Sequence, residues 1–320
     1  MKKFAFIIFI FVIITALFSS CSENGRRQSG GINIICTIFP QYDWVSQIIG
    51  EENADKFNLT LLLDSRVDLH SYNPSVQDMA KIKTCDVFIY VGGHSDDWTR
   101  DALSGANPDI ITLNLVEILG DLIKYDDHDH DECDDDHGDE EYHIDEHVWL
   151  SIRHAKIICA EIAGMLSKID PDNAQAYNKN LEEYILKLSD LDAEYQKAAD
   201  SAGVKVLVFA DRFPFLYLLE DYGIDYYSAF SGCSAETEAG FVTIISLANR
   251  INQFGLSAVM VTESSDQSIA KTVIRETNDK NQRILTLDSM QSVTSADVKK
   301  GVTYISVAEN NLSVLKEALK

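Results

Sequence analysis

Short apolar runs recur along the chain and are separated by stretches of helical length. Four runs rich in Val, Ile and Leu come early and four late, at 32–39, 59–63, 86–93, 109–115, 204–210, 256–263, 282–288 and 303–309. Near-continuous runs of this kind are typical of parallel strands that helices cover on both faces. A chain of 320 residues is long enough for two domains. The pattern therefore predicts an α/β protein with two parallel-sheet lobes, at 32–169 and 203–320.

The region between the two sets of runs has helical periodicity. Ser151 is a good N-cap for a helix that starts at Ile152. Asp170 and Pro171 favour the start of a second helix, whose apolar residues recur at spacings of three and four. A single helix over 170–202 would be a rigid rod of about 40 Å. We therefore expect one long helix to join the lobes and to prevent a wide hinge motion.

The N-terminus has the features of a targeting segment. Two lysines precede an apolar run at 4–18, which is short for a membrane-spanning helix and typical of a signal-peptide core. The letters "LFSSC" resemble a bacterial lipoprotein cleavage site, so residues 1–21 are expected to be a signal peptide with Cys21 as the lipidated residue. Ordinary cleavage near Ser20 is the alternative. The polar, glycine-rich residues 22–31 would be a flexible tether, and the protein would be lipid-anchored on the extracytoplasmic face of the cell membrane.

The charge of the chain limits its partners. The formal net charge is −24, whereas nucleic-acid binding needs clustered Lys and Arg. We therefore expect no nucleic-acid partner. A negative field attracts cations instead.

Much of this charge lies in one segment, 126–146, which also contains four of the eight histidines. Imidazoles and carboxylates at this density bind divalent cations weakly at many geometries. We expect the segment to be a loop that collects metal through His128, His130, His137 and His143. An acidic surface loop without any role in affinity is the alternative.

Residues 143–147 also read H-x-x-E-H, which is a zinc-protease signature. That chemistry requires both histidines on one face of a helix, with Glu146 as the base that activates a zinc-bound water. Helix signals begin only at Ser151, so the sequence argues against it. A zinc-dependent hydrolase on an α/β scaffold is kept as an alternative function.

Four candidate metal ligands lie at the ends of predicted elements. His70 follows the second apolar run, Asp211 and Glu263 each end a run of the later set, and His147 precedes the helix at 152. Ligands of parallel α/β proteins bind beyond the carboxyl ends of strands, and two imidazoles with one or two carboxylates suit zinc or manganese. We expect a metal site in the cleft between the lobes. A helix cap or an exposed surface position is the alternative for each residue.

Three motifs carry a resemblance to a known family. "TIFPQYDWVSQIIG", "VDLHSYNPS" and "DEHVWLS" resemble motifs of the metal-binding subunits of zinc and manganese ABC importers. The resemblance implies two α/β lobes joined by one long helix, with His70 and His147 as ligands from the first lobe and Glu263 as the carboxylate of the second. It also implies a non-enzymatic, monomeric receptor that delivers a divalent metal to an ABC permease. A surface adhesin stabilised by its metal is a further alternative.

The chain departs from that family at one position. The family usually places His or Glu directly after the first strand of the second lobe, where this sequence has Ala210. Alanine cannot bind metal, so Asp211 is the candidate for the third ligand, with water or Cys233 as alternatives. Imidazole favours zinc over manganese, so the expected metal is Zn²⁺, with Mn²⁺ as the alternative.

Overall fold

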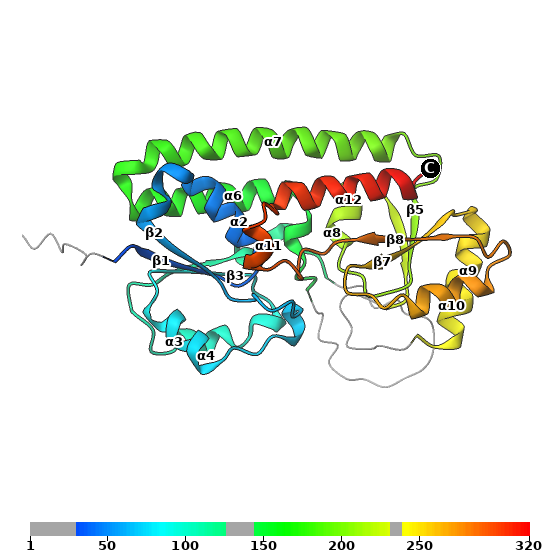
Figure 1. Cartoon of the computed structure of the whole chain (residues 1–320), viewed down its shortest axis with the longest axis horizontal. Coiled ribbons are helices and arrows are strands. Elements are labelled where there is room, and N and C mark those ends of the chain that lie inside the picture. Colours follow the sequence, from blue (N-terminus) through cyan, green and yellow to red (C-terminus); the bar gives the residue numbers. More distant parts are fainter. Residues whose placement is uncertain (1–29, 126–143, 231–238) are drawn as a thin grey trace, which may run out of the picture. The chain divides into compact units, whose positions relative to one another are not determined.

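The computed structural model describes residues 30–125, 144–230 and 239–320. Within these residues eight strands form two four-stranded sheets, and every pairing is parallel (Figure 1). The first sheet has the order β2-β1-β3-β4 and the second the order β6-β5-β7-β8. The strands are β1 (Ile32–Cys36), β2 (Phe57–Leu61), β3 (Val87–Tyr90), β4 (Ile111–Asn114), β5 (Val206–Phe209), β6 (Asp225–Ser228), β7 (Ala258–Thr262) and β8 (Arg283–Leu287).

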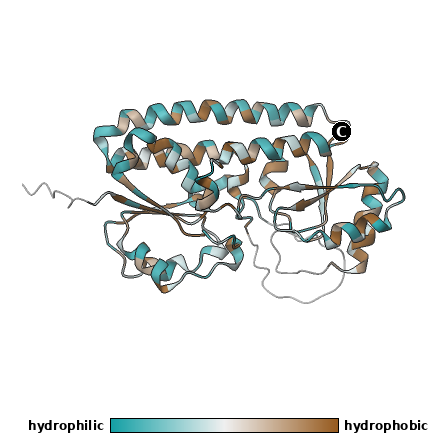
Figure 2. Cartoon of the chain, viewed as in Figure 1, coloured by the Kyte–Doolittle hydropathy of each residue, from teal (hydrophilic) through white to brown (hydrophobic). Residues whose placement is uncertain are grey.

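Helices connect and cover the strands. They are α2 (Phe39–Ile49), α3 (Val76–Thr84), α4 (Thr99–Leu103), α5 (Leu115–Leu119), α6 (Ile152–Ile169), α7 (Ala174–Asp200), α8 (Leu216–Asp221), α9 (Phe241–Phe254), α10 (Ser268–Glu276), α11 (Ser295–Val298) and α12 (Tyr304–Ala318). Figure 2 shows that the strands are mainly hydrophobic, as expected for strands buried beneath helices. The predicted α/β architecture with two parallel sheets is confirmed.

The predicted long helix is α7, which has 27 residues. It packs against α6, α2 and α12 (Figure 1). The predicted start at Pro171 is wrong, because Pro171–Asn173 form a 3₁₀ turn and α7 begins at Ala174. The Asp170 carboxylate does not cap the turn; it accepts hydrogen bonds from the Asn173 side chain and the Tyr177 hydroxyl instead. The predicted N-cap at Ser151 is confirmed, since its hydroxyl accepts a hydrogen bond from the His154 amide.

One predicted strand is wrong and one strand was missed. The run at 303–309 begins helix α12. Thr303 forms a capping box with Ser306, and the buried side chains then recur at spacings of three and four, which is helical periodicity. The missed strand is β6, a short edge strand whose sequence DYYS lacks an apolar run.

The two sheets belong to one compact unit, Ile32–Lys320. Helix α12, which follows the last strand of the second sheet, begins against the first half of the chain. The Tyr304 amide donates to the buried carboxylate of Asp43 in α2 at 3.0 Å, and the Tyr304 hydroxyl donates to the Trp149 carbonyl at 2.8 Å. Trp149 in turn donates its indole N–H to the Ser289 carbonyl at 2.9 Å. The division into lobes at 169 and 203 stays a prediction.

None of the helices within the described ranges is both long and apolar enough to span a membrane.

Candidate metal centre

Two histidines from distant parts of the chain face each other. His70 lies in a 3₁₀ turn (Leu69–Ser71) after β2, and His147 directly precedes another (Val148–Leu150) before α6. Their Nε2 atoms are 3.2 Å apart. Two nitrogens bound to one tetrahedral zinc at about 2.0–2.1 Å would be separated by about 3.3 Å. The pair therefore has the spacing of two neighbouring ligands on one metal ion.

Asp145 fixes the orientation of His147. One oxygen of its carboxylate accepts hydrogen bonds from the His147 amide at 2.8 Å and from Nδ1 of the ring at 2.9 Å. Both residues are buried, each 2% exposed. Because a carboxylate is only an acceptor, Nδ1 must carry the hydrogen, and in the neutral ring Nε2 then carries the lone pair. The lone pair thus points towards His70, as metal binding requires.

Hydrogen bonds from both halves of the chain fix the turn that bears His70. The His70 amide donates to Asp68 at 2.8 Å, and the Leu69 amide donates to the Gln291 side chain, which follows the last strand of the second sheet, at 3.1 Å. The ring nitrogen Nδ1 lies 2.6 Å from the Ser95 hydroxyl and 3.8 Å from Oε2 of Glu146. Both ring nitrogens of His70 therefore have neighbours.

The surroundings of His70 keep its ring neutral. Burial, followed by the neighbouring His147, lowers the pKa of His70 from its usual value near 6.5 to about 4. A histidine must be neutral to bind a metal ion. His70 is therefore ready to bind across the whole neutral and mildly acidic range.

This pKa predicts how stability depends on pH. Between pH 6.5 and about 4 the unfolded chain binds a proton at His70 and the folded chain does not. The free energy of unfolding of the metal-stripped protein should therefore fall as the pH decreases through this range. His70→Asn should flatten that part of the profile, measured by urea denaturation at several pH values. A His70 ring signal that titrates near pH 6.5 in NMR spectra would contradict the prediction.

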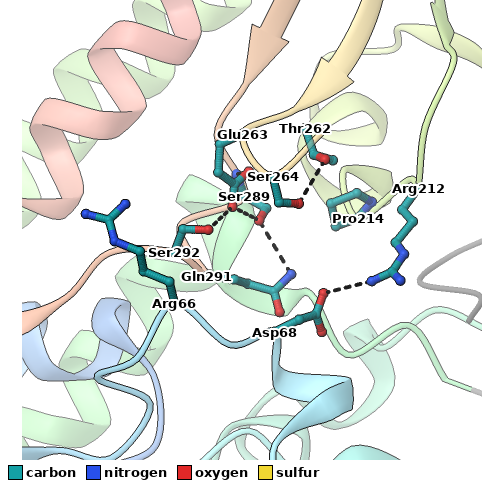
Figure 3. Close-up of a pocket in the computed structure, with 10 residues that line it drawn as sticks. All are labelled: Arg66, Asp68, Arg212, Pro214, Thr262, Glu263, Ser264, Ser289, Gln291 and Ser292. Carbon is teal, nitrogen blue, oxygen red and sulfur yellow. Dashed lines mark hydrogen bonds and ion pairs between the residues drawn. The ribbon is translucent and has the colours of Figure 1, made fainter. Parts of the chain in front are cut away.

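Glu263 directly follows β7, but its carboxylate faces serines. It accepts hydrogen bonds from the Ser289 amide at 2.9 Å, from the Ser289 hydroxyl at 2.8 Å and from the Ser292 hydroxyl at 3.2 Å (Figure 3). Glu263 lines a cavity of about 50 Å³, together with Arg66, Asp68, Arg212, Pro214, Thr262, Ser264, Ser289, Gln291 and Ser292. The predicted carboxylate thus lies beyond the carboxyl end of its strand, as expected, with both oxygens already in hydrogen bonds.

Asp211 lies two residues after β5 and joins it to the end of β7. One carboxylate oxygen accepts from the amide and hydroxyl of Thr262 at 3.1 and 2.9 Å, and the other from the Arg212 amide at 2.8 Å. Ala210 is buried in a hydrophobic cluster beside α9 and α10. The side chain at the position where the family usually has a ligand therefore faces the hydrophobic core.

In the part of the chain that the structure describes, no three His, Cys, Asp or Glu side chains lie close enough to hold a metal ion together. The structure brings His70 and His147 together, but it does not group Glu263 or Asp211 with them. The collecting histidines at 128, 130, 137 and 143, together with Cys21 and Cys233, lie outside the described residues.

The sequence analysis missed the residues that hold the histidines. Asp145 and Ser95 were not considered, and Glu146 was considered only as a protease base. The D-x-H spacing of Asp145 and His147 was the available signal, because a carboxylate two residues before a histidine can reach its ring nitrogen. Nothing in the sequence places Ser95 beside His70.

Comparison with known proteins identifies the family. A family model described as "Zinc-uptake complex component A periplasmic" (ZnuA) matches residues 34–318. The chain belongs to this family. The resemblance to metal-binding subunits of importers is thereby confirmed, and the family is one of transport proteins rather than enzymes.

Individual relatives agree with this assignment. The zinc-binding lipoprotein AdcA of Streptococcus pneumoniae R6 is 31% identical over 319 residues, which are 99% of this chain and 61% of AdcA. The high-affinity zinc uptake system protein ZnuA of Bacillus subtilis is 28% identical over 317 residues, 98% of this chain and 96% of that protein. This ZnuA family member thus spans less than two thirds of AdcA but nearly the full length of the Bacillus protein.

Solved structures show the same fold. The metal-dependent lipoprotein YcdH of Bacillus subtilis has a TM-score of 0.73 at 26% identity, covering 90% of this chain and 99% of that one. The Zn(II)-bound ZnuA-like domain of Streptococcus pneumoniae AdcA has a TM-score of 0.69 at 28% identity, covering 91% and 99%.

Proposed function

We propose that this protein captures a zinc ion outside the cytoplasm and delivers it to an ABC permease. The observation that carries the proposal is the His70–His147 pair, whose Nε2 atoms are 3.2 Å apart. Its membership of the ZnuA family and its similarity to a Zn(II)-bound domain support the choice of metal. Two imidazoles in the site also favour zinc over manganese. Zinc is the cargo here rather than a cofactor.

Uptake and turnover measurements test this function. A strain that lacks the gene should take up less radioactive zinc when zinc is scarce, and the intact gene should restore uptake. The purified protein should bind one zinc ion in its defined site and release it to a chelator. Zinc-dependent hydrolysis would favour the hydrolase, whereas binding to host matrix proteins with no effect on uptake would favour the adhesin.

The structure gives no support to the hydrolase. His147 precedes a 3₁₀ turn instead of lying within a helix. Glu146, the proposed base, is buried, and one of its oxygens accepts a hydrogen bond from the Ser95 amide at 2.8 Å. The inverzincin arrangement needs a helical H-x-x-E-H segment, and residues 145–147 are not helical.

We propose His70, His147, Glu263 and Asp211 as the ligands of the cargo. For Glu263 to join the histidines, it must exchange its bonds to Ser289 and Ser292 for the metal. Asp211 must likewise give up bonds to Thr262. Such changes are local, in keeping with a rigid α7.

Glu263→Gln and Asp211→Asn test the two carboxylates. We expect Glu263→Gln to weaken zinc binding by more than ~100-fold, because replacing even an outer partner of a ligand costs ~10–100-fold. A comparable loss in Asp211→Asn would support that residue as a ligand. Unchanged affinity with a lower unfolding midpoint would mean that Asp211 only joins β5 to β7. Competition with a zinc chelator of known affinity gives both values.

The collecting loop and the anchor extend the proposal. We propose that His128, His130, His137 and His143 bind zinc weakly and pass it to the defined site, and that Cys21 carries a lipid that holds the protein at the membrane. Relatives named as lipoproteins support the anchor. Deleting residues 127–142 should remove weakly bound zinc beyond the first equivalent and reduce uptake at scarce zinc. Unchanged stoichiometry and uptake would contradict the collecting role.

A further inference from the structure

Glu146, Ser95 and His70 form a small polar cluster beside the histidine pair. The Ser95 hydroxyl lies 2.6 Å from Nδ1 of His70, and the Ser95 amide donates to Oε1 of Glu146 at 2.8 Å. Oε2 of Glu146 lies 3.8 Å from the same Nδ1. Glu146 is 4% exposed, and this oxygen has no hydrogen-bond partner among the described residues. An unsatisfied buried carboxylate oxygen is costly, so its place beside His70 requires an explanation.

The hydrogens in this cluster can be assigned from the chemistry of the groups. A neutral imidazole carries one N–H, a serine hydroxyl carries one hydrogen, and a carboxylate carries none. The Ser95 hydroxyl can donate either to Nδ1 of His70 or to Glu146, with which it also forms a side-chain hydrogen bond. A hydrogen bond to an ionised acceptor is about twice as strong as one between neutral groups. The Ser95 hydrogen therefore belongs to Glu146, and Nδ1 of His70 must donate to the Ser95 oxygen.

We propose that Ser95 and Glu146 are positioning residues that hold the His70 ring in the tautomer with its hydrogen on Nδ1. The lone pair is then on Nε2, the atom that faces Nε2 of His147. Asp145 has the same effect on His147 through a direct hydrogen bond. Each histidine of the pair thus has its own acidic residue, one direct and one acting through a hydroxyl.

The backbone around Glu146 is shaped to admit its carboxylate. Gly93 has a φ of +88°, and a Cβ at this position would lie 2.5 Å from Oε1 of Glu146. A side chain would therefore displace the carboxylate, and the positive φ also favours glycine. The neighbouring Asp96 closes the same loop by accepting from the Val91 and Gly92 amides. Asp96 thus holds the loop together, whereas the free oxygen of Glu146 faces His70.

The first experiment reads the tautomer directly. Long-range ¹H–¹⁵N correlation spectra of the full-length, metal-stripped protein distinguish Nδ1–H from Nε2–H in each ring. Wild type should show His70 with its hydrogen on Nδ1. Ser95→Ala should give a mixture of tautomers, and Glu146→Gln should shift the ring towards Nε2–H, because an amide N–H can donate to the Ser95 oxygen and turn the hydroxyl hydrogen towards Nδ1. Ser95→Thr keeps the hydroxyl and should preserve the wild-type tautomer.

The second readout is zinc affinity. Ser95→Ala and Glu146→Gln should each weaken binding by ~10–100-fold, and Ser95→Thr should restore it. Asp97→Asn is the matched control, because it removes a carboxylate from the same loop whose side chain is 57% exposed and paired with His94. An unchanged His70 tautomer in both Ser95→Ala and Glu146→Gln, each shown to be folded by circular dichroism, would overturn the inference.

The affinity arm rests on the proposed function, whereas the tautomer arm does not. If wild type bound no zinc but showed the expected tautomers, the proposed function would fail and the positioning role would stand. If wild type bound zinc tightly while His70 carried its hydrogen on Nε2, the reverse would hold.

Discussion

The His147→Ala protein is expected to lose zinc affinity by more than ~100-fold, because changing even an outer partner of a metal ligand costs ~10–100-fold. His147 is the more constrained member of the pair. It is buried, and Asp145 binds both its amide and its ring. Its Nε2 lies 3.2 Å from that of His70, so removal of either ring leaves a single imidazole at the site. Isothermal titration with a competing chelator measures the loss.

His94→Ala is the matched control for this experiment. His94 lies in the turn beside Ser95, but its side chain is 79% exposed and pairs with Asp97 at 2.9 Å. We expect its affinity to equal that of wild type. The His147→Ala protein should also fail to restore zinc uptake in a strain that lacks the gene. Wild-type affinity in His147→Ala would show that the pair is not the site and would remove the main support for the proposed function.

The second large effect concerns stability. Trp149→Ala should lower the free energy of unfolding by ~3–5 kcal/mol, the usual cost of removing a large buried aromatic ring. Trp149 is fully buried, its ring centroid lies 5.1 Å from that of His147, and its indole N–H donates to the Ser289 carbonyl. Ser289 also donates to Glu263. The same substitution should therefore loosen the contact between the histidine pair and the loop after β8.

Trp149→Phe separates packing from hydrogen bonding. It keeps an aromatic ring beside His147 but leaves the Ser289 carbonyl without its donor, so a smaller loss of ~1–3 kcal/mol is expected. Urea denaturation followed by far-ultraviolet circular dichroism gives the midpoints, and the slopes show whether unfolding stays cooperative. Equal losses in the two variants would mean that the hydrogen bond, and not the ring, accounts for the effect.

Most of the fold could be predicted because parallel strands have a strong local signal. Seven of the eight predicted runs coincide with observed strands, since a strand buried on both faces must be apolar along its whole length. The errors occur where that signal is weak or shared. The run at 303–309 is apolar enough for a strand, but its capping box and its spacing of buried residues make it helix α12. Strand β6 lies at an edge and needs no apolar run.

The candidate site was predictable only in part. The motifs identified His70 and His147, and the family assignment agrees with that choice. Strand ends also identified Glu263 and Asp211 as polar residues at the right edge of the second sheet. Their present partners, Ser289, Ser292 and Thr262, follow or end other strands. Local sequence cannot reveal such partners, because they meet only when the sheet is assembled.

The sequence by itself determined the parallel α/β architecture, the long connecting helix, the family and the two histidines, because each of these depends on local periodicity or on a contiguous motif. Only the tertiary structure decided how the histidines are presented. His70 and His147 are 77 positions apart, and their Nε2 atoms meet because Asp145, Ser95 and Gln291 hold the two turns through hydrogen bonds. Hydrogen bonds are short and directional, so the orientation of each ring depends on atoms that folding brings from distant parts of the chain.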